Sequence, residues 1–463
     1  MSASLEDDRS NHKRADAGSL DTIVAVATAS GHAGIGVVRL SGPRSKAIAE
    51  TVCGGVLIAR HAHHRQFSDS TGTIIDDGIA LWFAGPASYT GEDLVELQGH
   101  GNPVLLDALV LRCCELGARL ARPGEFTERA FLNDRLDLTQ AEAVADVINA
   151  STVGAARAAI RSLQGEFSTA ADQLVKDLIT LRVHVESAFD FPDEDIDFLA
   201  EAPVRDGLAA LRRDVQALEH KARAGMRLQD GAVVVLAGQP NAGKSSLLNR
   251  LATRDIAIVT DIPGTTRDVL KITLDINGLP VELVDTAGMR DAQDAIEQEG
   301  VRRTRVQLEE ADAVLLVYDI SQGATQADHD LASECGATPV CWVGNKADLL
   351  TSAPVKPVDN PRCEVSALTG EGMDALRQRI ADLLSVDGEF TGGTVSARRR
   401  HLAALHVAIP ALQRAEETLH TGVAGELVAE ELRIAQEALE SLSGRFTADD
   451  LLGEIFSTFC IGK

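Results

Sequence analysis

The spacing of apolar residues divides the chain into four stretches with different periods. From about Asp21 to Asp134, short apolar runs such as TIVAVAT, GVVRL, GIALWFA and DLVELQGHG are separated by Gly, Pro and Asp. Runs of this kind are typical of strands. One run with helical spacing lies near Leu105–Leu116, so the first stretch predicts an α+β domain.

The second stretch, from Arg135 to about Arg223, has the period of amphipathic helices. In LTQAEAVADVINA, Thr139 and Glu142 have the spacing of a capping box, which predicts that a helix begins there. The acidic segment FDFPDEDIDF interrupts this stretch. It lacks the alternating ligands and the glycine of a calcium loop, so we expect a solvated turn between helices.

The last two stretches differ again in period. Strand and helix patterns alternate from Gly231 to about Ser385, as in a doubly wound sheet. Helical spacing returns from Ser396, and Gly444 is expected to end one helix. Thr447 and Asp450 resemble the cap of a final helix. The apolar residues that would share one face of it are Leu451, Leu452, Ile455, Phe456 and Phe459.

Composition narrows the class of protein. A chain of 463 residues suggests two to four domains, and 45% hydrophobic with 24% charged residues is usual for a soluble protein. No apolar run approaches the roughly 20 residues of a membrane span. Residues 1–19 lack the apolar centre of a secretory signal and are expected to be a disordered tail. Seven cysteines without CxxC spacing favour reduced thiols in a cytoplasmic protein.

The net charge of −25 argues against a broad basic surface for nucleic acid. A nucleic-acid substrate would therefore need a local patch. The segment SARRRH, at Ser396–His401, is one such cluster. A solvated helix start explains the same residues without any nucleic acid.

The strongest motif is VVVLAGQPNAGKSSLLNRL. An apolar strand leads into Gly238-x-x-x-x-Gly243-Lys244-Ser245, and a helical run follows. This is a P-loop in its strand–loop–helix context. The loop N–H groups and the helix N-terminus attract phosphate oxygens. Lys244 is expected to reach the β- and γ-phosphates, and the Ser245 hydroxyl to bind Mg²⁺.

Further motifs specify guanine. The Asp348 carboxylate of VGNKAD can accept two protons from guanine, a pair that adenine does not offer. Asn345 is expected to stabilise the loop and the Lys346 stem to cover the base. The segment SAL, at Ser366–Leu368, follows at the position of a backbone contact to the guanine oxygen and ends in Leu rather than Lys or Arg.

Two motifs between them complete a GTP site. In TDIPGTTRD, Thr266 can join the Mg²⁺ shell, and in ELVDTAGM, Asp285 can hold the metal through water while Gly288 senses the γ-phosphate. The residues predicted to contact GTP are Asn241, Ala242, Gly243, Lys244, Ser245, Ser246, Thr260, Asp261, Ile262, Pro263, Gly264, Thr265, Thr266, Asp285, Thr286, Ala287, Gly288, Asn345, Lys346, Ala347, Asp348, Ser366, Ala367 and Leu368.

The residue that would orient water is not obvious. Ras-like enzymes place a Gln after D-x-x-G, whereas this chain has Met289, which cannot orient water by hydrogen bonding. Asn241 and the backbone of Thr260–Thr265 could enclose a monovalent cation beside the phosphates. A neutral loop residue is the alternative for Asn241.

The motifs resemble those of the MnmE (TrmE) family of tRNA-modification GTPases from Asp21 to Lys463. Matching segments include ELQGHG, ARPGEFTERAFLNDRLDL, DFPDEDIDFL, IVTDIPGTTRDV, DTAGMR, GELVAEELR and the terminal FCIGK. The resemblance implies a multidomain fold. It comprises an α+β folate-binding-like domain at 20–134, a helical domain at 135–230 and 386–463, and an inserted Ras-like α/β P-loop GTPase domain at 231–385.

The resemblance also implies metal and catalytic residues. Potassium would bind at Asn241, Thr260, Ile262 and Thr265, and Mg²⁺ at Ser245 and Thr266. The potassium ion would replace an arginine finger when two GTPase domains meet. Glu297, in DAIEQEG, would position the attacking water, although by sequence alone it reads as a surface helix residue.

The first domain would form a homodimer and bind a 5-formyl- or 5,10-methylene-tetrahydrofolate. The matching contacts are Arg39, Glu96, Arg135 and Lys463; Arg135 stands where the family often has Lys. By sequence alone, Arg39 and Glu96 could be a surface pair at a strand edge. Cys460 could be catalytic, since the resemblance directs the CIGK tail towards the folate pocket. By sequence alone, packing at a helix end is the favoured explanation for Cys460, whereas a prenylation box fits poorly.

The function implied is a potassium-stimulated GTPase of the cytoplasm. With the FAD- and NADH-dependent partner MnmG, in a heterotetramer, it would add an aminomethyl or carboxymethylaminomethyl group to carbon 5 of the wobble uridine of certain tRNAs. A ribosome-assembly or regulatory GTPase is the alternative. It would share the nucleotide motifs but would not need the folate-type domain or the CIGK tail.

Overall fold

The computed structural model describes residues 21–190, 202–255, 271–285, 311–336, 338–350, 362–384, 394–421 and 425–444, and near the end 453, 455–457, 459 and 462. The contacts divide the chain into two compact units. One unit comprises residues 1–145 with 440–463, and the other comprises residues 146–439. Each unit is described by itself.

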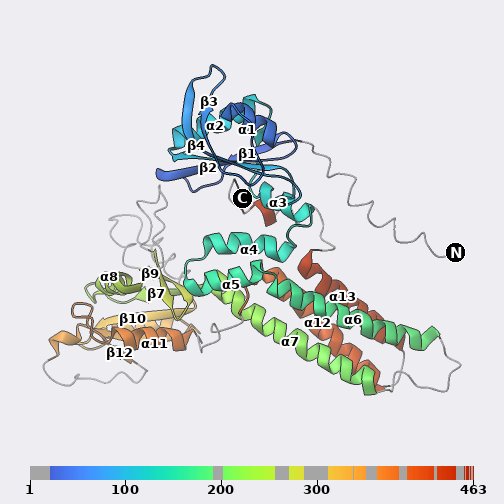
Figure 1. Cartoon of the computed structure of the whole chain (residues 1–463). Coiled ribbons are helices and arrows are strands. Elements are labelled where there is room, and N and C mark those ends of the chain that lie inside the picture. Colours follow the sequence, from blue (N-terminus) through green and yellow to red (C-terminus); the bar gives the residue numbers. More distant parts are fainter. Residues whose placement is uncertain are drawn as a thin grey trace, which may run out of the picture. The chain divides into compact units, whose positions relative to one another are not determined.

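The first unit is built on a mixed sheet of six strands in the order β3-β4-β5-β2-β1-β6. The strands are β1 (Ile23–Val26), β2 (Ala33–Ser41), β3 (His63–Ser68), β4 (Ile74–Phe83), β5 (Leu94–Gly101) and β6 (Arg119–Leu120). Helices α1 (Ser45–Cys53) and α2 (Pro103–Glu115) pack against the sheet (Figure 1). Inward residues such as Phe67, Leu97 and Leu109 are fully buried between them.

A second, smaller core lies around α3 (Glu125–Leu132). Phe126 packs with Ile23 of β1, and Tyr89 lies against this cluster. Near the end of the chain, Phe456 and Phe459 are buried against the first turns of α4 (Leu138–Asn149). The apolar face expected for the last helix is therefore confirmed at its described positions, whereas Leu451 and Leu452 lie outside the described residues.

The start of α4 differs from the expected capping box. The helix begins at Leu138, so Thr139 is inside it, and the Thr139 hydroxyl donates to the Leu442 carbonyl. The reciprocal cap is formed by Asp137 and Gln140 instead: each backbone N–H donates to the side-chain oxygen of the other residue. The prediction was wrong by two residues because Thr139 is buried at 1% exposure and its hydroxyl is used in packing.

The second unit contains long helices and a second sheet. The helices are α5 (Val153–Leu163), α6 (Glu166–Asp190), α7 (Ala202–Asp230), α12 (Arg399–Thr421) and α13 (Gly425–Ser443). Helix α7 packs on both α6 and α12. Most of the acidic segment FDFPDEDIDF, from 191 onwards, lies outside the described residues. In the SARRRH cluster, Arg398 pairs with Asp146 at 2.8 Å, just before α12 begins.

The second sheet has the order β12-β11-β10-β7-β9-β8. Its strands are β7 (Ala232–Ala237), β8 (Lys271–Ile276), β9 (Leu279–Asp285), β10 (Ala313–Asp319), β11 (Val340–Asn345) and β12 (Arg362–Glu364). Only the pair of β8 with β9 is antiparallel among the paired strands described here. The helices beside it are α8 (Lys244–Asp255), α10 (Gln326–Glu334) and α11 (Met373–Leu383).

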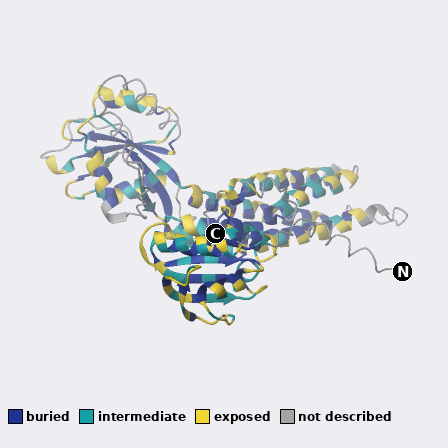
Figure 2. Ribbon diagram, turned by 90° about the horizontal axis from the view of Figure 1, so that it is seen from above, coloured by how far each residue is buried: buried dark blue, intermediate teal, exposed yellow. Residues whose placement is uncertain are grey.

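Each face of this second sheet has its own core. Figure 2 shows its strands as largely buried and the outer faces of its helices as exposed. The alternation predicted from Gly231 onwards is confirmed. In such sheets ligands bind beyond the carboxyl ends of the parallel strands, where the loops after β7, β10, β11 and β12 all emerge.

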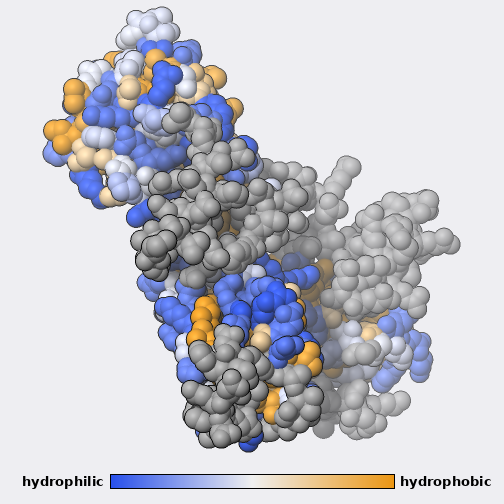
Figure 3. All heavy atoms as spheres, turned by 90° about the vertical axis from the view of Figure 1, so that its right-hand side faces the viewer, coloured by the Kyte–Doolittle hydropathy of each residue, from blue (hydrophilic) through white to orange (hydrophobic). Residues whose placement is uncertain are grey.

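Hydrophilic residues dominate the coloured surface in Figure 3, and hydrophobic residues form small, separate patches there. No helix in the described part of the chain combines the length and the apolar character that crossing a membrane requires.

Candidate functional site

The P-loop connects β7 to α8. Asn241 has a left-handed backbone with φ 66°, and Gly243 has φ 91°. A Cβ atom at Gly243 would lie 2.2 Å from the Asn345 amide nitrogen, so only glycine fits between the two loops. The Lys244 ammonium donates to the carbonyls of Gly238 at 2.9 Å and Gln239 at 3.0 Å. The lysine is therefore held across the mouth of the loop.

The metal-binding residues predicted at the start of α8 lie beside the end of β9. The Ser245 hydroxyl donates to Asp285 Oδ2 over 3.0 Å. Asp285 is 2% exposed, whereas Ser245 is exposed. A hydroxyl next to a buried carboxylate is a donor set that suits Mg²⁺, which prefers oxygen ligands.

Asn345 connects three loops. Its amide nitrogen donates to the Ala242 carbonyl of the P-loop at 2.9 Å, and its amide oxygen accepts from the Ala367 N–H at 3.1 Å. Asn345 is 2% exposed. The phosphate loop and the two base-recognition loops are thus held in one arrangement by a single buried side chain.

The carboxylate expected to read guanine is also fixed. The Ser366 hydroxyl donates to Asp348 Oδ1 at 2.5 Å. The Lys346 ammonium lies 2.7 Å from Oδ2 of Asp319, the last residue of β10. From α8, the Arg250 guanidinium donates to the carbonyls of Ala367 and Leu368.

In the first unit, Arg39 and Glu96 form a close pair. They lie opposite each other on β2 and β5, and Arg39 Nη2 lies 2.9 Å from Glu96 Oε1. Both strands are interior to the sheet, so the reading as a strand-edge pair is wrong. The Arg39 guanidinium lies 5.6 Å from the centre of the Tyr89 ring and 5.8 Å from that of Phe126, which keeps it against aromatic faces.

Gly462, near the end of the chain, contacts the same arginine. Arg39 Nη1 donates to the Gly462 carbonyl at 3.4 Å. Gly462 has φ 92°, and a Cβ atom there would lie 2.1 Å from the Val26 carbonyl oxygen. Glycine at this position therefore lets the backbone of Gly462 lie directly against the end of β1. Arg135, by contrast, is exposed, and its side chain passes close to Gly91.

Comparison with known proteins settles the family. The model of the MnmE helical domain matches residues 138–460, and the model described as GTP-binding protein TrmE N-terminus matches residues 22–135. The chain belongs to the MnmE family. The resemblance drawn from the motifs and the multidomain fold class are confirmed.

Full-length relatives in the MnmE family agree with these matches. A protein of Nitrosomonas europaea named tRNA modification GTPase MnmE is 51% identical over 447 residues, which cover 96% of this chain and 99% of that protein. Proteins of the same name from Stutzerimonas stutzeri and Pseudomonas aeruginosa are also 51% identical, over 455 and 451 residues. Each alignment covers 96% of this chain and 99% of the relative.

Thirteen of the residues predicted to bind GTP, metal or folate or to act in catalysis lie outside the described residues. They are Thr260, Asp261, Ile262, Pro263, Gly264, Thr265, Thr266, Thr286, Ala287, Gly288, Glu297, Cys460 and Lys463. The potassium site is therefore represented by Asn241 alone, and the folate site by Arg39, Glu96 and Arg135.

Two residues at the guanine loops were not predicted from the sequence. Asp319 stands outside every nucleotide motif, yet it pairs with Lys346 of the motif NKAD. Arg250 lies in α8, five residues after the last residue of Gly238–Ser245, and no role was expected for it, yet it donates to the loop of Ser366–Leu368. The position of Asp319 at the carboxyl end of a parallel strand was the signal that could have found it, because such ends meet at the ligand edge of the sheet.

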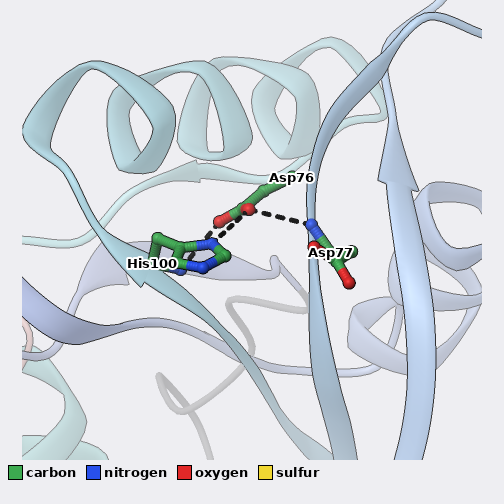
Figure 4. A group of neighbouring side chains, drawn as sticks. All are labelled: Asp76, Asp77 and His100. Atoms are coloured by element: carbon green, nitrogen blue, oxygen red, sulfur yellow. Dashed lines mark hydrogen bonds and ion pairs between the residues drawn. The ribbon is translucent and has the colours of Figure 1, made fainter.

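A separate polar cluster lies on β4 and β5 of the first unit. Asp76, Asp77 and His100 place ligand-type atoms within 4.8 Å of one another (Figure 4). Asp76 Oδ1 accepts from the Asp77 N–H and bonds His100 Nδ1 at 2.7 Å, while Oδ2 accepts from the His100 N–H. These hydrogen bonds already occupy the buried carboxylate, so the cluster is explained by its role in joining two strands.

Proposed function

We propose that this chain is a potassium-stimulated GTPase that modifies the wobble uridine of certain tRNAs. Acting with MnmG, which supplies FAD and NADH chemistry, it would add an aminomethyl or carboxymethylaminomethyl group at carbon 5. A tetrahydrofolate derivative would provide the one-carbon unit. Membership of a family of tRNA modification GTPases supports this proposal.

The observation that carries the GTP part is the pair of hydrogen bonds made by Asn345. They fix the P-loop and the loop of Ser366–Leu368 at set positions relative to each other. A nucleotide bound here would place its phosphates at the α8 N-terminus and its base against Asp348. Because the Asp348 carboxylate can only accept protons, it pairs with the N–H and amino groups of guanine and repels the ring nitrogen of adenine.

The metals fit the residues that are described. Asn241 offers an amide oxygen from a loop that turns through a left-handed residue, which Asn tolerates well. Ser245 and Asp285 offer neighbouring oxygens for Mg²⁺. A bound potassium ion would supply positive charge beside the phosphates, as an arginine finger does in other GTPases. Glu297 is proposed to orient the attacking water.

The folate part rests on Arg39, Glu96 and the CIGK tail. Glu96 can accept two protons from the amino and N–H edge of a pterin, and Arg39 holds that carboxylate in place. The hydrogen bond from Arg39 to the Gly462 carbonyl, within the CIGK segment, supports this proposal. Cys460, two residues before Gly462, is proposed to lie near the one-carbon chemistry, with Arg135 and Lys463 as further folate contacts and a second copy completing the homodimer.

The potassium proposal is tested by GTP hydrolysis in matched KCl and NaCl. We expect a rate at least about tenfold higher in KCl, because the ion stabilises charge that develops in the transition state. Asn241→Gly suits the left-handed backbone and removes the amide oxygen, so it should abolish most of the gain while GDP affinity stays nearly unchanged. An equal rate in both salts for the unchanged chain would contradict the proposal.

The tRNA proposal is tested by mass analysis of tRNA nucleosides from cells that lack this chain. The modified wobble uridine should disappear and return when the intact chain is supplied, but not when Lys244→Ala is supplied. A ribosome-assembly GTPase, the alternative, predicts unchanged wobble uridines in all three strains.

A further inference from the structure

Asp319 and Lys346 meet at the edge of the second sheet where the guanine loops begin. Asp319 is the last residue of β10, and it lies directly opposite Asn345, the last residue of β11. Lys346 then adopts a left-handed backbone, with φ 67°. This turn leads its side chain back to Asp319, and the two charged groups meet at 2.7 Å.

We propose that Asp319 is a positioning residue for guanine recognition, which acts by holding the Lys346 side chain in place over the base. The inference rests on the proposed guanine site. It adds a specificity residue that none of the nucleotide motifs contains.

The contacts around Asp319 explain how it can hold a flexible lysine. The Asp319 carboxylate also accepts from the Ser321 N–H at 3.0 Å and from the Ser321 hydroxyl at 2.6 Å. Its side chain is only 15% exposed, against 33% for that of Lys346. Burial raises the pKa of Asp319, but the hydrogen bonds from Lys346 and Ser321 outweigh burial and leave that pKa below its usual value. The carboxylate is therefore charged at neutral pH.

The ion pair has two consequences for the base. Lysine has four rotatable bonds, and fixing its ammonium group at Asp319 removes much of the freedom of its stem before nucleotide binds. The pair also turns the ammonium charge away from the base, so that the stem presents apolar surface. A base that packs against a fixed lysine stem stays aligned with the Asp348 carboxylate, which accepts hydrogen bonds from the guanine edge.

A purely local role for Asp319 is the alternative. Its bonds to Ser321 stabilise the turn after β10, and the backbone of Gln322 and Gly323 closes the same turn onto the Asp319 carbonyl. If this turn were all that Asp319 supports, its removal would affect the fold of the loop and not guanine binding through Lys346. The two roles separate in a double-mutant cycle.

The experiment measures the dissociation constants of GDP and IDP by calorimetry for the full chain with MgCl₂. The variants are Asp319→Asn, Lys346→Met and the two together. We expect each single variant to bind GDP about tenfold more weakly, and the double variant to bind no more weakly than either one. The preference for GDP over IDP should fall in all three, because the base loses its register with Asp348.

Two matched variants serve as controls. Ser321→Ala removes one of the hydrogen bonds to Asp319 and leaves the ion pair with Lys346, so GDP binding should weaken far less than in Asp319→Asn. Asp330→Asn makes the same change of charge on an exposed residue of α10, whose carboxylate accepts a hydrogen bond from Gln326. This variant should leave the dissociation constant of GDP unchanged. Melting temperatures establish that each variant is folded.

Independent effects, in which the double variant loses the product of the two single losses, would overturn the inference while leaving the guanine site intact. So would a loss in Ser321→Ala equal to that in Asp319→Asn. If the unchanged chain failed to bind GDP at all, the proposed guanine site itself would be wrong and the inference with it.

Discussion

Asp76 and His100 show how a buried carboxylate can fix an exposed side chain. Asp76 is 5% exposed in its side chain, whereas His100 is 65% exposed. Burial raises the pKa of Asp76, but the hydrogen bonds from His100 and from the backbone outweigh burial and hold that pKa below its usual value. The hydrogen bond to Asp76 raises the pKa of His100.

The signs of these two shifts define a pH window. Because the pKa of Asp76 is lowered in the folded chain, its contribution to stability is lost as the pH falls through that pKa. Because the pKa of His100 is raised, its contribution is lost as the pH rises through the raised value. In Asp76→Asn, NMR titration should therefore show the pKa of His100 falling towards 6.5, its ordinary value. An unchanged titration would mean that the pair does not form in solution.

The cap of helix α4 lies two residues before the position predicted from the sequence. Asp137 and Gln140 cap it, while Thr139 reaches the Leu442 carbonyl at 2.9 Å, close to the end of α13. Residues 138, 141 and 145 of α4 then bury the aromatic residues near the end of the chain. The first turn of α4 thus joins segments about 300 residues apart in sequence.

This arrangement predicts different effects for two neighbouring substitutions. Asp137→Ala should lower the free energy of unfolding by about 1 kcal/mol, because it leaves the Gln140 N–H without its side-chain acceptor. Glu142→Ala, at the position once expected to complete the cap, should leave helix capping unaffected. The amide exchange rates of the first turn of α4 distinguish the two, and faster exchange in Glu142→Ala than in Asp137→Ala would contradict the assignment.

At the scale of the whole molecule, acidic residues outnumber basic ones by 69 to 44. Much of this acid is exposed, but Glu125 is 2% exposed and lies among Arg119, Arg129 and Arg122. Burial raises the pKa of Glu125, yet the hydrogen bonds from Arg119, the Arg122 N–H and Arg129 outweigh burial and leave the pKa below its usual value. Asp319 and Glu219 are shifted in the same direction.

A lowered carboxylate pKa gives stability that is complete above the pKa of the unfolded chain and is lost as the pH falls through that of the folded chain. The chain should therefore lose stability progressively below about pH 4.5, although its net negative charge also falls there. Glu125→Gln should lower the free energy of unfolding by about 2 kcal/mol near neutral pH, as measured by urea unfolding at several pH values. The free energy of unfolding should also fall less steeply between neutral and acidic pH than in the unchanged chain. If the free energy of unfolding fell with pH as steeply as in the unchanged chain, Glu125 would not contribute to the pH dependence of stability.

The nucleotide motifs could be read from sequence because each is a short run whose chemistry acts where it stands. The phosphate-binding groups of the P-loop lie within the eight residues of Gly238–Ser245, and the strand and helix around it have clear periods. The pair of Arg39 and Glu96 was different. The two residues are 57 positions apart, and they meet because β2 and β5 pair in one register.

Sequence by itself determined the order of the elements, the phosphate and guanine motifs and the family, since periodicity and motif chemistry are local properties of the chain. Tertiary structure alone decided which distant groups meet: Asp319 with Lys346, Arg250 with the loop of Ser366–Leu368, and Gly462 with β1. The reason is physical. Side-chain pairing across strands depends on register and on the direction in which each loop leaves the sheet, and neither is written in the residues of one segment.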